Sequence, residues 1–221
     1  MRTVVFDLDG TLADTSGDLL DAANAAFRAG GHGDVLEHPR DAGVALRGGR
    51  AMLTLGYERL GIAPSAALID AGYPVLLRAY GQQICAKTVL YDGAEAVCTR
   101  LRRKGYKLAV CTNKPIELAT PLLAALGITS LFDAVIGAKS LPVSKPDPAP
   151  FVAAVQQAGG VVAQSLLVGD TATDRKTSTA AGVPSVLVTF SPAGQSVREL
   201  FPDETIDHFD ELDAVVEKLI G

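Results

Sequence analysis

Residues 3–14 read TVVFDLDGTLAD, an apolar run that ends in two carboxylates, Asp7 and Asp9. Such a run predicts a buried β-strand. A carboxylate at the end of a buried strand is unfavourable unless a partner or a metal ion compensates its charge. The alternative is a strand that ends in a solvated Asp-Gly turn. The stretch favours neither interpretation by itself, so any partners must come from the rest of the chain.

The composition is that of a globular protein, and it excludes several classes. Of the 221 residues, 48% are apolar, which is enough to form a core. The net charge of -5 and the lack of a basic run argue against nucleic acid as a partner. We find neither a signal peptide nor an apolar run of the ~18 residues that a membrane helix needs, so we expect a cytoplasmic protein without a membrane partner. Three scattered cysteines and three scattered histidines favour neither a disulfide framework nor a zinc site.

The pattern of the chain changes near residue 87. Between 15 and 86 it predicts helices only, over 19–29, 51–60 and 64–83, the last interrupted or restarted at Pro74. From 87 onward, apolar strands alternate with helices, which predicts an α/β fold with a parallel sheet between two layers of helices. The predicted strands are 107–111, 133–137, 165–168 and 185–189, and the predicted helices are 94–104, 115–126, 148–158, 173–181 and 211–220.

Polar residues follow several of these predicted strands. Ligands of open parallel sheets bind beyond the carboxyl ends of the strands, so we expect these residues to meet at one edge. Two unit charges ~4 Å apart interact by ~4 kcal/mol at an effective dielectric constant near 20, and the carboxylates among them therefore require a cation. Oxygen ligands without His or Cys suit Mg²⁺, with Asp7 and Asp170 as its expected side-chain ligands. The residues at this edge are Asp7, Asp9, Thr112, Asn113, Lys145, Asp170 and Asp174.

The same edge suits phosphoryl transfer. A phosphate dianion that approaches a carboxylate nucleophile meets ~8 kcal/mol of repulsion on the same estimate, which Mg²⁺ and Lys145 are able to offset. A carboxylate nucleophile implies an aspartyl phosphate, and a second carboxylate two residues later is able to protonate the leaving oxygen and then deprotonate water. The candidate phosphate-binding residues besides Lys145 are Thr112, Asn113, Gly10 and Thr11.

Four motifs resemble, in order, those of the haloacid dehalogenase superfamily: DLDGTL at 7–12, TN at 112–113, KPDP at 145–148 and a Gly-Asp pair at 169–170 followed by Asp174. The resemblance implies a Mg²⁺-dependent phosphatase. It makes Asp7 the nucleophile and a metal ligand, and Asp9 the general acid/base and a backbone-carbonyl metal ligand. Thr112 and Lys145 would bind the transferring phosphoryl group, and Asp170 would ligate Mg²⁺ with support from Asp174.

The resemblance also implies a domain organisation and a substrate class. Residues 1–14 and 87–221 would form a Rossmann-like, doubly wound core, and 15–86 an inserted α-helical cap. The short cap and the segments at 91–93 and 171–182 are most similar to phosphoglycolate phosphatases, so 2-phosphoglycolate is the predicted substrate. Arg47 is predicted to bind the substrate carboxylate. We expect a monomer or a homodimer.

Other interpretations remain open. Arg47 and Arg50 are also compatible with a solvated basic face. Thr112 and Asn113 precede Pro115 and are predicted to cap a helix as well as bind phosphate. Asp174 is compatible with a purely structural role at a helix N-terminus. For the whole protein the alternatives are a sugar-phosphate mutase of the same superfamily, a haloacid dehalogenase, which usually lacks an acidic residue at the position of Asp9, and, from another class, a signalling module that accepts a phosphoryl group.

Overall fold

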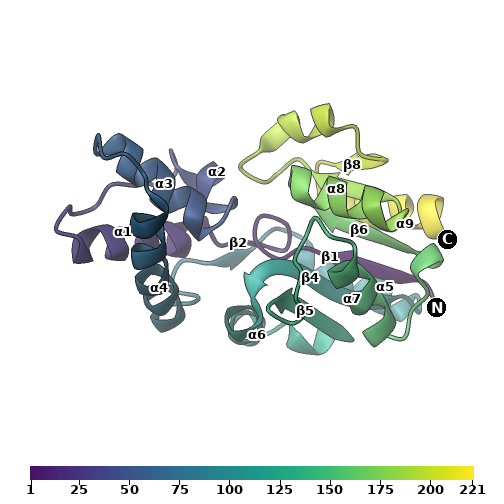
Figure 1. The fold of residues 1–221 in the computed structure, drawn as a ribbon. Coiled ribbons are helices and arrows are strands. Elements are labelled where there is room, and N and C mark those ends of the chain that lie inside the picture. The colour runs from purple at the N-terminus through teal and green to yellow at the C-terminus, as the bar shows by residue number, and fades with distance from the viewer. The chain divides into compact units, whose positions relative to one another are not determined.

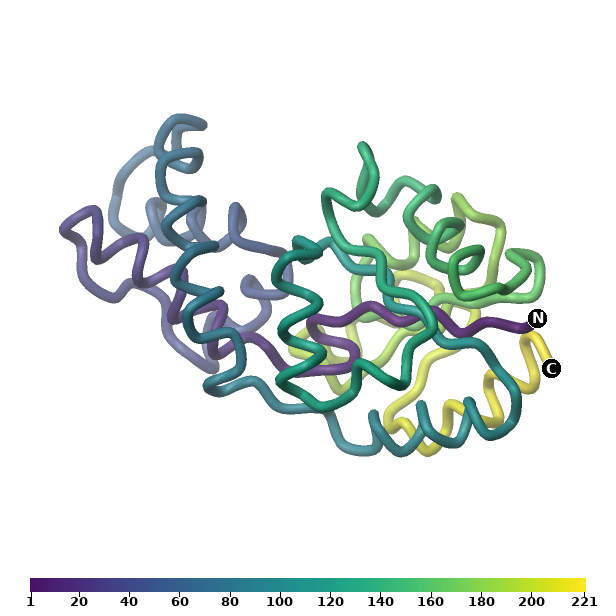
Figure 2. Tube along the Cα trace, turned by 90° about the horizontal axis from the view of Figure 1, so that it is seen from below, coloured from purple at the N-terminus to yellow at the C-terminus, as the bar shows by residue number.

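Six parallel strands form one sheet in the computed structural model, which describes residues 1–221 (Figure 1). Across the sheet they follow the order β5 (Ala134–Ala138), β4 (Lys107–Pro115), β1 (Thr3–Phe6), β6 (Ser165–Gly169), β7 (Ser185–Val188) and β8 (Glu204–Ile206). The N-terminal strand β1 therefore lies between β4 and β6, and its trace runs through the middle of this part of the molecule (Figure 2). This order is the doubly wound α/β arrangement that the sequence predicts.

Helices cover both faces of the sheet. Side chains alternate along β1, so Val5 belongs to the core cluster that includes Phe151, whereas Phe6 contacts Phe132 edge-on. All four residues of β1 are buried, which explains why the strand reads as a continuous apolar run. The helices of this part are α5 (Ala94–Arg103), α6 (Ile116–Ala125), α7 (Ala149–Gln157), α8 (Ala172–Ala181) and α9 (Leu212–Ile220), with 3-10 turns η1 (Thr129–Leu131), η2 (Val162–Gln164), η3 (Gly194–Leu200) and η4 (Phe209–Glu211).

The chain divides into two compact units, and the second one, Asp14–Val89, is helical. Phe27 is fully buried there and meets Tyr57 edge-on, with ring centroids 5.3 Å apart. Gly56 makes room for it, because a Cβ at this position would lie 2.0 Å from the Phe27 ring. The helices of this unit are α1 (Ser16–Ala29), α2 (Ala42–Ala45), α3 (Gly49–Arg59) and α4 (Ala66–Gln82).

Two short strands connect the units. The first unit consists of Met1–Ala13 and Leu90–Gly221, so the chain leaves it through β2 (Ala13–Asp14) and returns through β3 (Val89–Leu90), which pair with each other. The unit boundaries thus fall at 13/14 and 89/90, against predicted boundaries at 14/15 and 86/87. Within the second unit, the buried Asp18 carboxylate accepts hydrogen bonds of 2.9 and 2.7 Å from the N–H and hydroxyl of Thr88, and this fastens α1 to the returning chain.

Several local predictions are wrong. α4 is continuous through Pro74, because this proline lies on the exposed side of the helix, where water is able to solvate the carbonyl that loses its partner. The strand predicted to end at residue 111 continues to Pro115. The sequence does not predict α2 or β8, because four and three residues are too few to show a periodic pattern.

Candidate active site

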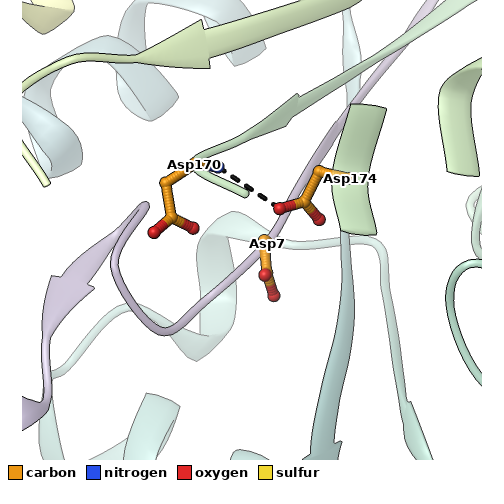
Figure 3. Close-up of side chains that lie close together, drawn as sticks. All are labelled: Asp7, Asp170 and Asp174. Atoms are coloured by element: carbon orange, nitrogen blue, oxygen red, sulfur yellow. Dashed lines mark hydrogen bonds between the residues drawn. The ribbon is translucent and has the colours of Figure 1, made fainter. Parts of the chain in front are cut away.

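Three buried carboxylates meet beyond the ends of the central strands. Asp7 follows β1, Asp170 follows β6, and Asp174 lies in the first turn of α8. One carboxylate oxygen from each lies within 4.8 Å of the others. Figure 3 shows the three side chains together with the hydrogen bond of 3.3 Å that the Asp170 N–H donates to Asp174 Oδ2. Three of the four carboxylates that the sequence selects at the strand ends therefore lie together.

Burial of these acids makes their negative charge unfavourable. It raises the pKa of Asp7 from 3.8 to about 6, against the opposing charge of Lys145. It also raises the pKa of Asp170 well above its ordinary value, and the charges of Asp174 and Asp7 add to this effect. Asp170 Oδ2 is buried and accepts no hydrogen bond. An oxygen of this kind, in an all-oxygen cluster without His or Cys, fits a hard divalent cation such as Mg²⁺.

Lys145 supplies the positive charge within the cluster. Its ammonium lies 3.0 Å from Asp7 Oδ2 and 2.6 Å from Asp174 Oδ1, and its side chain is 1% exposed. Burial lowers the pKa of Lys145, but the charges of Asp174 and Asp7 outweigh burial and raise it above its ordinary value. The lysine is therefore a fixed cation beside the predicted nucleophile.

Asp174 has the structural role at the start of a helix that the sequence analysis allows, and it also pairs with Lys145. Its Oδ2 accepts hydrogen bonds from the N–H and hydroxyl of Thr171, at 3.1 and 2.6 Å, which satisfies the start of α8, while its Oδ1 receives Lys145. Gly169 makes this position possible, because a Cβ there would lie 2.4 Å from the Cβ of Asp174. With both oxygens engaged, Asp174 is better suited to support a metal site than to be a principal ligand.

Thr112 is buried at this edge but does not cap a helix. Its hydroxyl oxygen accepts a hydrogen bond of 3.1 Å from the Lys114 N–H, within the extension of β4. α6 begins only at Ile116, and its N-cap residue Pro115 makes no side-chain capping bond. The predicted capping role of Thr112 and Asn113 is therefore wrong, because the strand continues past both residues.

The predicted substrate-binding residues of the first unit are partly engaged in holding other site residues. The Thr11 hydroxyl is buried and donates to Asp170 Oδ1 at 3.1 Å. The Asn113 amide donates to the backbone carbonyl of Lys145 at 2.9 Å. Gly10 has a φ of 80°, in the left-handed region that favours glycine, and its N–H donates to the Ala13 carbonyl. These bonds fix the shape of the site.

Asp9 lies outside the carboxylate cluster. Its Oδ1 is 2.7 Å from the ammonium of Lys114, a buried lysine that the sequence analysis does not select. One sequence feature could have identified Lys114 as a site residue. It lies two positions after Thr112, and alternate residues of a strand share a face. The site thus holds two buried cations.

Arg47 and Arg50, the two arginines that the sequence analysis singles out, differ in their contacts. Arg50 pairs with Asp70 at 2.7 Å and lies 5.0 Å from the centre of the Tyr73 ring. Arg47 is exposed in the turn between α2 and α3 and takes part in no salt bridge or side-chain hydrogen bond. Of these two arginines, Arg47 is therefore the one that remains available to a ligand.

Comparisons with known proteins cover both units. A family model described as haloacid dehalogenase-like hydrolase matches residues 1–182. A protein from Mesorhizobium japonicum named phosphoglycolate phosphatase is 38% identical over 98% of this chain and 96% of its own. A protein of the same name from Cereibacter sphaeroides is 34% identical over the whole of both chains. A crystal structure described as a predicted phosphoglycolate phosphatase from Haemophilus somnus matches 97% of each chain, with a TM-score of 0.83 and 26% identity.

Proposed function

Because the chain belongs to the haloacid dehalogenase-like hydrolase family, we propose that it hydrolyses a small phosphomonoester, 2-phosphoglycolate first among them, through an aspartyl phosphate on Asp7. The family and its relatives identify an enzyme of the phosphoric monoester hydrolase class. One observation supports the mechanism most directly: a buried lysine lies 3.0 Å from the predicted nucleophile, within a cluster of carboxylates. A nucleophilic carboxylate requires such a cation to meet a phosphate dianion.

The proposed reaction has two steps. In the first, a carboxylate oxygen of Asp7 bonds to phosphorus, the ester P–O bond breaks, and Asp9 donates a proton to the leaving oxygen. In the second, Asp9 takes a proton from water, which attacks phosphorus and releases inorganic phosphate and the Asp7 carboxylate. Lys145 offsets part of the ~8 kcal/mol of repulsion between a dianion and the nucleophile, and Thr112 is the proposed hydroxyl contact to the phosphoryl group.

Asp7 and Asp170 are the residues proposed to hold Mg²⁺, with Asp174 supporting them. Asp170 provides the buried oxygen that accepts no hydrogen bond, and Asp7 provides a carboxylate in the same 4.8 Å cluster. When bound, Mg²⁺ supplies positive charge to the phosphate oxygens. Asp9 is proposed to contribute its backbone carbonyl to the metal site, because its side chain pairs with Lys114.

A phosphate-release assay over a panel of phosphate esters tests this function. We expect 2-phosphoglycolate to have the highest kcat/KM, and we expect EDTA to lower its turnover at least about ten-fold, with recovery on addition of excess Mg²⁺. Turnover that survives thorough chelation would contradict the metal assignment, and interconversion of sugar-phosphate isomers that is faster than phosphate release would favour a mutase.

No helix has both the length and the apolar character to cross a bilayer. A cytoplasmic location and a monomeric or dimeric state stay predictions.

Arg47→Ala tests the proposed contact to the substrate carboxylate. We expect kcat/KM for 2-phosphoglycolate to fall about ten-fold, since a hydrogen bond to a charged group contributes ~1.5–3 kcal/mol. The kcat/KM for 2-hydroxyethyl phosphate, which has a hydroxymethyl group in place of the carboxylate, should hardly change. Arg50→Ala is the matched control, because Arg50 is already paired with Asp70. Equal losses on both esters in Arg47→Ala would refute the contact.

A further inference from the structure

We propose that Lys114 is a positioning residue that orients the Asp9 carboxylate for proton transfer, so that the two residues act as one unit. This inference rests on the proposed function, in which Asp9 is the general acid and base. Lys114 Nζ lies 2.7 Å from Asp9 Oδ1. The Lys114 side chain is only 3% exposed, and that of Asp9 is 17% exposed. A buried ammonium requires a partner that accepts its hydrogen bond, and the Asp9 carboxyl oxygen is within reach.

The two buried lysines pair with different acids of the site. Lys145 contacts Asp7 and Asp174, whereas Lys114 contacts Asp9. The Asp9 side chain is correspondingly absent from the 4.8 Å carboxylate cluster. An ammonium that fixes one carboxylate oxygen restricts rotation of the whole carboxylate, and the second oxygen then keeps a defined direction. Lys114 therefore separates the proton-transfer group from the groups proposed to bind the metal.

The backbone that carries Lys114 is itself held in place. The Lys114 N–H donates to the Thr112 hydroxyl oxygen at 3.1 Å. The pairing of β4 with β5 shifts register between Cys111 and Pro115, so Lys114 lies within an irregular part of the strand. In this part, the backbone of β5 lies close to that of β4: a Cβ on Gly137 would lie only 2.8 Å from the Lys114 carbonyl oxygen. A segment fixed from two sides is suited to hold a side chain in one geometry.

Leaving-group dependence distinguishes a positioning role from a structural one. An alkoxide leaves from phosphorus only with help from an acid, whereas 4-nitrophenolate leaves without a proton. In Lys114→Met we expect kcat/KM for the best alkyl phosphate of the panel to fall at least about 30-fold, and that for 4-nitrophenyl phosphate to fall less than about three-fold. The ratio kcat/KM reports only the steps through cleavage of the ester bond, so hydrolysis of the aspartyl phosphate does not obscure the comparison.

A double variant tests whether Lys114 acts through Asp9. Adding Lys114→Met to Asp9→Asn should lower kcat/KM for the alkyl ester no further than Asp9→Asn alone. The matched control is Lys107→Met, which removes a lysine from the other end of β4 where it pairs with Asp133 at 2.9 Å, and which should leave the ratio between the two esters unchanged. Lys114→Arg keeps the charge and should recover part of the lost activity on the alkyl ester.

Equal losses on the two esters in Lys114→Met, or additive losses in the double variant, would overturn the role of Lys114. If Lys114→Met fails to fold, Lys114→Arg provides the same comparison, because a displaced cation should still penalise the alkyl ester selectively. Failure of the proposed function gives a different result: the unmodified protein then releases phosphate from neither ester.

Discussion

Asp7→Asn is expected to abolish phosphate release while making the metal-free protein more stable near pH 8. An amide does not form the aspartyl phosphate, so kcat should fall by roughly 10⁴-fold or more. The gain in stability follows from the rise in the pKa of Asp7 from 3.8 to about 6. Between these pH values the folded protein binds more protons than the unfolded chain, so the free energy of unfolding falls as pH rises, by roughly 3 kcal/mol in total. The neutral asparagine avoids this loss.

Chemical unfolding in EDTA at pH 4 and pH 8 measures this effect. At pH 8 the variant should be more stable than the unmodified protein by roughly 1–3 kcal/mol, and at pH 4 the difference should nearly vanish. The control is Asp210→Asn, which removes an exposed carboxylate that pairs only with exposed or half-buried groups and should change stability by less than ~1 kcal/mol at either pH. A variant that is less stable than the unmodified protein at pH 8 would contradict the prediction.

The acids of the site are predictable from the sequence because their positions depend on the sheet. Asp7 and Asp170 directly follow buried apolar strands, and the carboxyl ends of parallel strands share one edge whatever the details of the loops. A loop separates Lys145 from the end of β5, so the strand pattern alone predicts the position of this residue less well. Its assignment to the site rests on the resemblance of residues 145–148 to a family motif. The family itself is confirmed by the match over residues 1–182.

The hydrogen-bond partners within the site are not predictable in the same way. Thr11 and Asn113 are predicted to contact substrate, but their side chains hold Asp170 and the Lys145 backbone. The direction of a side chain depends on contacts from distant parts of the chain, and Thr11 and Asp170 are 159 positions apart. The sequence likewise predicts that the strand ends at residue 111, whereas β4 continues to Pro115. In this extension the backbone of β5 approaches closely at Gly137, and no local sequence pattern indicates such a contact.

Lys145→Met should cause the largest loss of stability of any substitution considered. Its ammonium lies between two buried carboxylates, and a methionine leaves Asp7 and Asp174 without this cation. Removing one partner from a buried ion pair typically costs ~3–5 kcal/mol, because the remaining charge is left uncompensated. We expect this loss at pH 8, a smaller loss near pH 5 where Asp7 is able to accept a proton, and a fall in kcat of at least about 10²-fold.

Thermal and chemical unfolding with and without Mg²⁺ test the electrostatic origin of this loss. Millimolar Mg²⁺ should restore part of the stability of Lys145→Met, because a bound cation compensates the same carboxylates, but it should not restore the activity. Lys218→Met, which removes an exposed lysine paired with Glu204, should cost less than ~1 kcal/mol. Equal losses in the two variants would show that Lys145 is not an essential charge partner.

The double variant Asp7→Asn/Lys145→Met separates repulsion from lost packing. If Lys145 stabilises the fold by compensating Asp7, a neutral residue at position 7 should make the double variant more stable than Lys145→Met alone. If the methionine instead disturbs packing, the effects of the two substitutions should simply add. Because Asp7→Asn is itself expected to stabilise the metal-free protein at pH 8, the test is whether its stabilising effect is larger with methionine at position 145 than with lysine. A larger effect would mean that the charge needed for phosphoryl transfer is also the charge that keeps the acidic cluster folded.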